Sequence, residues 1–187
     1  MRTALTRSSA ERGILILLAA SFVINLGFSV IGPVFPYLIL ALKGVLKEVP
    51  EVVTGTIEAH KGAIEFGLLM AAFMATRAPA AALTGFFSDV FGRKSTILMG
   101  MGIYFLVSLG FVISNDIWTF ILLRAFQGLA SGMVWPVAEA YLADSVPRWS
   151  RGRVISAYTA VMLIAEAAGP SVGVAIYKSY VSLFGPE

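Results

Sequence analysis

The sequence contains no cysteine, one histidine and few charged residues. Without cysteine the chain can form neither a disulfide nor a thiolate metal site, and the single histidine, His60, cannot build a zinc site alone. Charged residues make up 13% of the 187 residues, against about 25% in soluble domains. The chain also lacks a glycine-rich phosphate loop and any nucleophile–base constellation. We therefore expect no enzyme, no cofactor and no nucleic-acid partner.

Apolar residues, by contrast, are in excess. They make up 58% of the chain, against about 45–50% in soluble domains, and the mean hydropathy is +0.84. They gather in five segments that are each about as long as the ~20 residues of a membrane-spanning helix, or longer. In lipid the backbone must satisfy its own hydrogen bonds, which favours helices. The sequence predicts an all-α integral membrane bundle, residues 1–187 forming a single transmembrane domain, with helices at about 14–42, 62–87, 96–114, 117–143 and 154–177.

Basic residues predict the orientation in the membrane. Alternate helix ends on one side hold eight of them: Arg2, Arg7, Arg12, Arg93, Lys94, Arg148, Arg151 and Arg153. The other side holds four: Lys43, Lys47, Lys61 and Lys178. Because basic residues accumulate on the cytoplasmic side, we expect a multi-pass protein of the cell (cytoplasmic) membrane with a cytoplasmic N-terminus. Residues 89–94 and 148–153 are then cytoplasmic, and residues 43–60 and 115–116 are external.

Polar residues recur at helical spacing in four of the five segments. They are Ser21, Asn25 and Ser29 in the first, Arg77 and Thr84 in the second, Arg124, Gln127, Ser131, Trp135 and Glu139 in the fourth, and Ser156, Thr159 and Glu166 in the fifth. A polar face in the membrane must meet protein or water. We expect these four helices to surround a wet cavity and the third to face lipid. The expected cavity lining includes Asn25, Ser29, Arg77, Gln127 and Ser131.

Small residues predict close helix contacts. Gly128 and Gly132 form a GxxxG pair, and Ala165, Gly169 and Gly173 form a longer ladder with the same spacing. Such spacing lets two helices approach closely. Packing alone is the simpler interpretation of both patterns.

The stretch GFFSDVFGRK, residues 85–94, connects the second and third segments. Gly92 can take a left-handed turn conformation at little cost. Asp89 and Arg93 are four residues apart and would pair if the turn were helical. An ordinary basic cytoplasmic loop is the alternative interpretation.

Four stretches, in order, resemble signatures of the major facilitator superfamily. Gly85, Asp89, Gly92, Arg93 and Lys94 resemble the signature between its second and third helices. LGFSVIGPVFP (26–36) and RAFQGLASG (124–132) look like the first- and fourth-helix motifs of its drug/proton antiporters. AGPSVG (168–173) resembles the antiporter motif of the fifth helix, with Val174 in place of a glycine.

The resemblance implies a fold and a function. Family members have two six-helix halves around a central cavity, and this chain resembles a first half that stops before the sixth helix. It implies proton-coupled efflux of small amphipathic molecules by alternating access. The implied partners are the lipid bilayer, a small-molecule substrate, protons, and a second transporter half or a second copy. Symport of a sugar or other metabolite, and a truncated or accessory membrane subunit without transport activity, remain alternatives.

The resemblance also implies roles for single residues. Proton coupling is implied for Arg124, and the acids Glu166 and Glu139, which lie within membrane segments, are candidates for the same role. A structural role is the alternative for each of the three residues. A cytoplasmic gating latch is implied for Gly85, Asp89, Gly92 and Arg93, which Asp144 is placed to join. The fifth-helix motif is carried by Gly169, Pro170 and Gly173.

Overall fold

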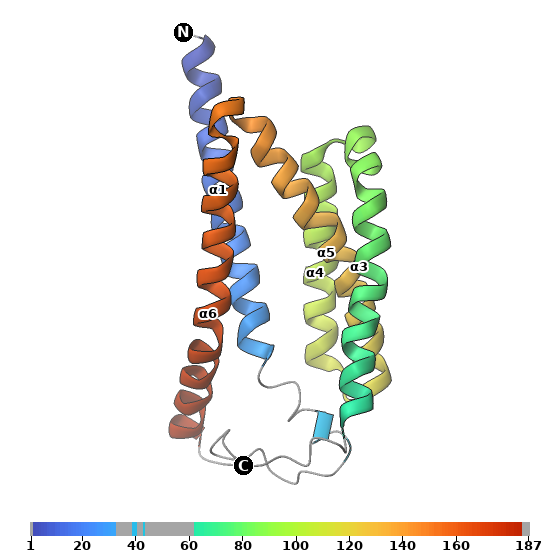
Figure 1. Ribbon diagram of the computed structural model, residues 1–187. Coiled ribbons are helices and arrows are strands. Elements are labelled where there is room, and N and C mark those ends of the chain that lie inside the picture. The colour runs from blue at the N-terminus through green and yellow to red at the C-terminus, as the bar shows by residue number, and fades with distance from the viewer. Residues whose placement is uncertain (1, 33–38, 41–42, 44–61, 185–187) are drawn as a thin grey trace. The chain divides into compact units, whose positions relative to one another are not determined.

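The computed structural model describes residues 2–32, 39–40, 43 and 62–184 (Figure 1). The helices are α1 (Arg2–Ile31), α3 (Ala63–Phe91), α4 (Arg93–Ile113), α5 (Ile117–Ser145), a short 3-10 turn (Arg148–Ser150) and α6 (Arg151–Phe184). No strand occurs among these residues. The prediction of an all-helical fold is confirmed.

Among the described residues, five helices are long and apolar enough to cross a membrane. The candidate spans have mean hydropathies between 1.4 and 2.2, and they are Glu11–Val30, Ala63–Phe91, Arg93–Ile113, Ile117–Ser145 and Arg148–Ile176. Three helices begin before their apolar runs: α1 at Arg2 rather than near Ile14, α4 at Arg93 rather than Thr96, and α6 at Arg151 rather than Val154. The predicted continuation of the first helix to residue 42 falls largely outside the described residues, as does the predicted external stretch from residue 44 onward.

The chain divides into two compact units, residues 1–35 with 142–187, and residues 36–141. A single domain over residues 1–187 stays a prediction. In the first unit α1 packs along α6 (Figure 1). A Cβ atom added to Gly169 would lie 2.3 Å from the Cβ of Ser29, and one added to Gly173 would lie 3.0 Å from the carbonyl oxygen of Val30. The predicted close packing of this ladder is confirmed, because only glycine fits at these approaches.

In the second unit α5 packs against both α3 and α4. A Cβ atom on Gly128 would lie 2.1 Å from the carbonyl oxygen of Phe73 in α3, and one on Gly132 would lie 2.6 Å from the Cβ of Ala80. On the α4 side, a Cβ atom on Gly100 would come as close to the Val134 side chain of α5 as the one on Gly132 comes to Ala80. The GxxxG pair therefore marks a helix contact, as predicted.

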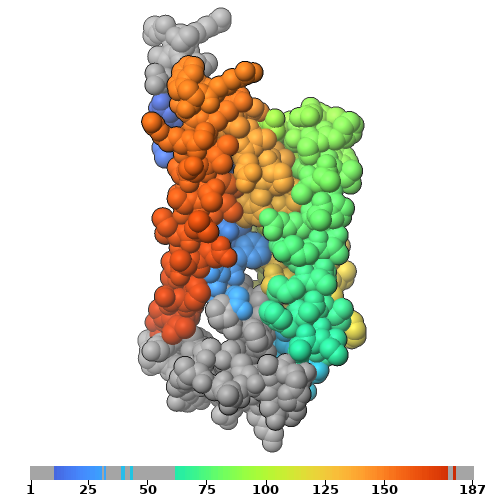
Figure 2. Space-filling model, in the orientation of Figure 1, coloured from blue at the N-terminus to red at the C-terminus, as the bar shows by residue number. Residues whose placement is uncertain are grey.

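The outer surfaces of these helices are apolar. On α3, which is drawn in green in Figure 2, the exposed large side chains include Leu68, Met74, Leu83 and Phe86. On α4 they include Leu98, Phe105, Leu106, Leu109 and Val112. So much exposed apolar surface fits a lipid surrounding rather than water.

A short connection joins α4 to α5, and Asp116 caps the N-terminus of α5. Its carboxylate accepts hydrogen bonds from the backbone N–H groups of Trp118 and Thr119, each at 2.9 Å, and from the Thr119 hydroxyl. These hydrogen bonds, led by that of the Thr119 side chain, lower the pKa of Asp116 below its ordinary value of 3.8. The positive end of the helix dipole also stabilises a carboxylate at this position.

Candidate functional site

Arg124 lies in the first half of α5 and is buried, with 8% of its surface exposed. Its Nη1 atom donates a hydrogen bond of 2.7 Å to the Oε1 atom of Gln127. Its guanidinium carbon lies 5.8 Å from the centre of the Phe73 ring of α3. An arginine inside a membrane span is expensive unless it meets polar or aromatic partners. The structure provides both kinds for Arg124.

Arg77 of α3 shares the same ring. Its guanidinium carbon also lies 5.8 Å from the Phe73 centroid, so the two cationic groups lie within about 12 Å of each other. The acids of α3 are far away, because Glu65 and Asp89 each lie twelve residues from Arg77, about 18 Å along the helix. Glu65 instead pairs with Lys43 at 2.5 Å. Arg77 and Arg124 therefore bring two guanidinium groups to the Phe73 ring, and no acid of α3 lies near them.

Thr76 ties the two helices together beside this site. Its hydroxyl donates a hydrogen bond of 2.6 Å to the carbonyl oxygen of Ala125 in α5. Together with the glycine contacts, this bond fixes the spacing at which Arg77 and Arg124 meet the Phe73 ring. Of the predicted site residues, the structure brings together Arg77, Arg124 and Gln127.

The sequence predicts a pairing of Asp89 with Arg93 only if the turn between them is helical, and the turn is not helical. Asp89 lies in the last turn of α3 and Arg93 is the first residue of α4, and no ion pair joins these two described residues. The reason is Gly92, whose φ of 86° and ψ of 145° interrupt the helix between them. Four-residue spacing therefore does not place the two side chains on one helix face. Gly85 faces open space, since nothing lies within 4 Å of a Cβ added there.

In the first unit Ser29 links α1 to α6. Its hydroxyl donates a hydrogen bond to the backbone carbonyl oxygen of Glu166. The Glu166 side chain is exposed, and Pro170 lies one turn further along the same helix. Asn25 bonds within α1, where its Nδ2 atom donates to the Ser21 carbonyl at 2.9 Å.

The other predicted residues lie along α5. Ser131 is buried, with 1% of its surface exposed, whereas Glu139 and Asp144 are exposed. Glu139 belongs to the same unit as Arg124, and Asp144 to the unit of α1 and α6. Within the described ranges no group of three or more histidines or acids could hold a metal ion.

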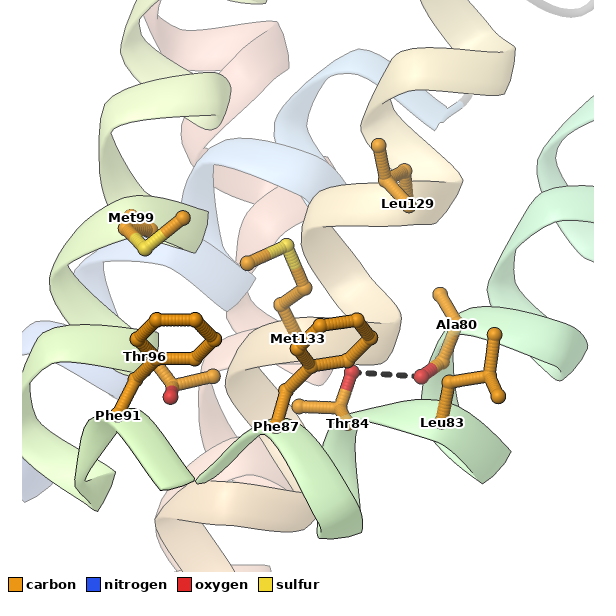
Figure 3. A pocket seen from close by; sticks show the side chains of 9 residues that line it. All are labelled: Ala80, Leu83, Thr84, Phe87, Phe91, Thr96, Met99, Leu129 and Met133. Carbon is orange, nitrogen blue, oxygen red and sulfur yellow. Dashed lines mark hydrogen bonds between the residues drawn. The ribbon is translucent and has the colours of Figure 1, made fainter. Parts of the chain in front are cut away.

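Sequence reasoning missed Phe73 and an apolar cavity. Phe73 resembles any lipid-facing residue in the sequence, although its spacing of four from Arg77 on one helix face was available as a signal. The cavity, of about 360 Å³, lies between α3, α4 and α5 (Figure 3). Its lining consists of Ala80, Leu83, Thr84, Phe87, Phe91, Thr96, Met99, Leu129 and Met133. No spacing rule predicts which apolar side chains leave such a space.

Comparison with known proteins identifies relatives among transporters. The profile described as Major Facilitator Superfamily matches residues 17–184. Multidrug resistance protein 2 of Bacillus subtilis is 26% identical over 85% of this chain and 36% of its own length. A D-xylose transporter of Levilactobacillus brevis is 30% identical over 57% of this chain and 23% of its own length.

An uncharacterised MFS-type transporter of Methanocaldococcus jannaschii is 28% identical over 59% of this chain. The match covers 28% of that relative, so this chain spans only about a third or less of the length of these proteins.

Proposed function

We propose that this chain, which belongs to the Major Facilitator Superfamily, forms part of a secondary transporter that exports small amphipathic molecules in exchange for protons. Membership of the family makes it a membrane transport protein and not an enzyme. The observation that carries the finer proposal is Arg124, a buried cation inside a membrane span with Gln127 and Phe73 as partners. A charge kept in such surroundings is expected to serve transport rather than packing alone.

Arg124 acts in the proposal through a change of surroundings. The charge of Arg124 is tolerated while Gln127 and Phe73 contact it. It attracts a carboxylate or a substrate anion when the central transport cavity opens. Alternating access supplies that opening, by rocking one half of the transporter against the other. Arg77 adds a second positive charge at the same ring, and in the proposal it lines the central transport cavity, which is distinct from the apolar cavity described above, together with Gln127 and Ser131.

Glu166 is the proposed proton carrier. It is an acid within the α6 span, one turn from Pro170 and beside the close contact of Gly169 with Ser29. An acid there can take up a proton from one side and release it when the cavity opens to the other. Glu139 is also an acid, but it lies nearer the end of α5, where its side chain can extend to the lipid headgroups.

The test is the uptake of ethidium into everted vesicles, whose outer surface is the cytoplasmic side, prepared from cells that express the gene with its native flanking sequence. The proposal expects proton-driven transport that a protonophore abolishes, and it expects Arg124→Gln and Glu166→Gln each to lower the rate at least tenfold. Glu139→Gln is the matched control and should cost less. Protonophore-insensitive transport would contradict proton coupling, and a near-normal rate in Glu166→Gln would contradict the assigned carrier.

Symport of a sugar or metabolite is the second candidate. The similarity to a protein named as a D-xylose transporter favours it, and so does Val174 at a position where the antiporter motif has glycine. Uptake of labelled D-xylose driven by an inward proton gradient would select symport. Exchange of ethidium against protons with no sugar uptake would select export.

We also propose that the chain works with a second transporter half or with a second copy of itself. The relatives are three or more times as long as the aligned part. A cavity between two halves needs a second wall facing the polar residues of this one. Light-scattering mass of the purified chain, with and without its native flanking sequence, measures the assembly. A monomer that exports ethidium alone would refute this proposal.

A further inference from the structure

The connection from α5 to α6 presents an exposed tryptophan between arginines. Its 3-10 turn is closed by a hydrogen bond of 2.9 Å, which the N–H of Ser150 donates to the carbonyl oxygen of Pro147. Trp149 is 87% exposed, although indole is one of the largest apolar groups in proteins. Arg148 and Arg153, which stand on either side of it in the sequence, are also exposed. The turn therefore holds an apolar ring and two guanidinium groups at the surface.

Arg12 of α1 lies at the same end of this unit. The helices α1 and α6 run in the same direction (Figure 1), and they come into close contact at Ser29 and Gly169. Arg12 and Gly152 each precede that contact by 17 residues, about 25 Å of helix. Arg12, which is exposed, is therefore about level with the start of α6, and packed helices are separated by only about 8–10 Å.

The expected membrane boundary also falls at these residues. The candidate span in α1 begins at Glu11, and the candidate span in α6 begins at Arg148. Because the apolar part of each helix follows directly, the first turns of both spans lie at the depth of the lipid headgroups. Tryptophan is enriched at this depth, since its ring is apolar and its N–H group can donate a hydrogen bond.

Positive charge dominates this end of the unit. Residues 2–12 and 144–153 contain six arginines and two acids, Glu11 and Asp144. Among the described residues, neither acid forms an ion pair with Arg12, Arg148 or Arg153. A guanidinium group suits a phosphate because it presents several donors in one plane. These three arginines and Trp149, which we call the arginine–tryptophan surface, therefore complement an anionic lipid headgroup.

We propose that the arginine–tryptophan surface binds the phosphate groups of anionic glycerophospholipids in the leaflet at this end of the helices. The three arginines contact the phosphates, and Trp149 lies among the headgroups. Basic residues beside a membrane span attract anionic lipids, and each residue raises the affinity about fivefold. The inference does not depend on the proposed transport reaction, since it concerns the membrane surface of one unit.

Native mass spectrometry of the purified chain measures the lipid preference, with dioleoyl phosphatidylglycerol and dioleoyl phosphatidylcholine in competition. We expect preferential retention of phosphatidylglycerol. The double variant Arg148→Gln/Arg153→Gln should reduce that preference by at least about tenfold. The matched variant Arg148→Lys/Arg153→Lys keeps both charges and should keep most of the preference. Equal losses in the two variants, or no preference in the native chain, would overturn the proposal.

Two single substitutions test the position of the charge. Arg153→Gln and Lys94→Gln each remove one exposed cation, and both cations belong to the predicted cytoplasmic side. Only Arg153→Gln should lower the preference several-fold, because Lys94 lies in the other unit and outside the arginine–tryptophan surface. Equal effects of the two substitutions would replace the site by a general effect of net charge and overturn the proposal.

Photo-crosslinking tests the unaltered chain and does not depend on how the variants fold. Phosphatidylglycerol with a diazirine in its headgroup should label peptides that contain Arg12 or Trp149. Labelling spread evenly over all connections between helices would overturn the assignment. Loss of the label on adding millimolar inorganic phosphate would identify a site for a free anion and equally refute the lipid.

Discussion

At the scale of single residues, the arrangement of two arginines at one phenyl ring is testable by a double-mutant cycle. Phe73→Leu and Arg77→Gln each remove one side of the contact in α3. We expect a coupling of about 0.5–2 kcal/mol in the free energy of unfolding, because a cation over a ring gains most where water is scarce. Steric trapping in bicelles measures that free energy.

Phe66→Leu in the same helix is the matched control for this cycle. Phe66 is eleven residues from Arg77 and cannot reach it, so its coupling to Arg77→Gln should be close to zero. Equal coupling at Phe66 and Phe73 would show that the ring does not hold the guanidinium group.

Asp116 gives a pH-dependent prediction. The pKa of Asp116 is lowered in the folded chain by hydrogen bonds from Thr119 and from the N–H of Trp118. A group with a lowered pKa adds stability above its unfolded pKa, and that stability is lost as the pH falls through the folded value. The melting temperature of the native chain should therefore exceed that of Asp116→Ala at pH 7, and the difference should shrink towards pH 3.

Asp116→Asn separates the charge from the cap. Asparagine also caps helices well but does not titrate, so its melting temperature relative to Asp116→Ala should stay constant over the same range. A difference between Asp116 and alanine that is the same at pH 7 and pH 3 would contradict the role of the carboxylate.

At the scale of the helices, the contact between α3 and α5 depends on Gly128. Even one methyl group there would meet the Phe73 carbonyl oxygen at 2.1 Å. Gly128→Ala should therefore lower the free energy of unfolding by about 1–3 kcal/mol, as overpacking does. Gly102→Ala in α4, where a Cβ meets nothing within 4 Å, should be neutral or slightly stabilising. Similar losses at both positions would mean that helix propensity, not contact, governs the effect.

The helices themselves could be predicted from the sequence because apolar length is what a bilayer requires. Their ends could not, since hydropathy marks the part in lipid and α1 continues as a helix through the polar residues back to Arg2. The close helix contacts at Gly128, Gly132, Gly169 and Gly173 could also be predicted, because small residues permit such approaches.

The candidate site was predictable only in part. Arg124 and Arg77 stand out in the sequence because charge is rare in an apolar segment. That both meet Phe73 depends on how α3 and α5 cross, which no single helix encodes. Pairing of Asp89 with Arg93 required a helical turn, and a single glycine, Gly92 with φ of 86°, interrupts the helix between them.

At the scale of the whole molecule, the basic residues make a prediction about orientation in the membrane. Lys94, at the turn between α3 and α4, and Arg153, near the start of α6, belong to the predicted basic side. Asn115 lies in the turn at the other end of α4, where α5 begins. Because basic residues are retained in the cytoplasm, Lys94 and Arg153 should face inward and Asn115 outward. All three side chains are exposed, so their accessibility reports the membrane side and not burial.

Single-cysteine variants measure this orientation directly, since the chain has no cysteine of its own. An impermeant maleimide added to intact cells should label Asn115→Cys and leave Lys94→Cys and Arg153→Cys unlabelled until the membrane is broken. The reverse pattern would invert the predicted topology. It would also reverse the direction of the proposed transport, because the side of the membrane from which each polar residue is reached would be exchanged.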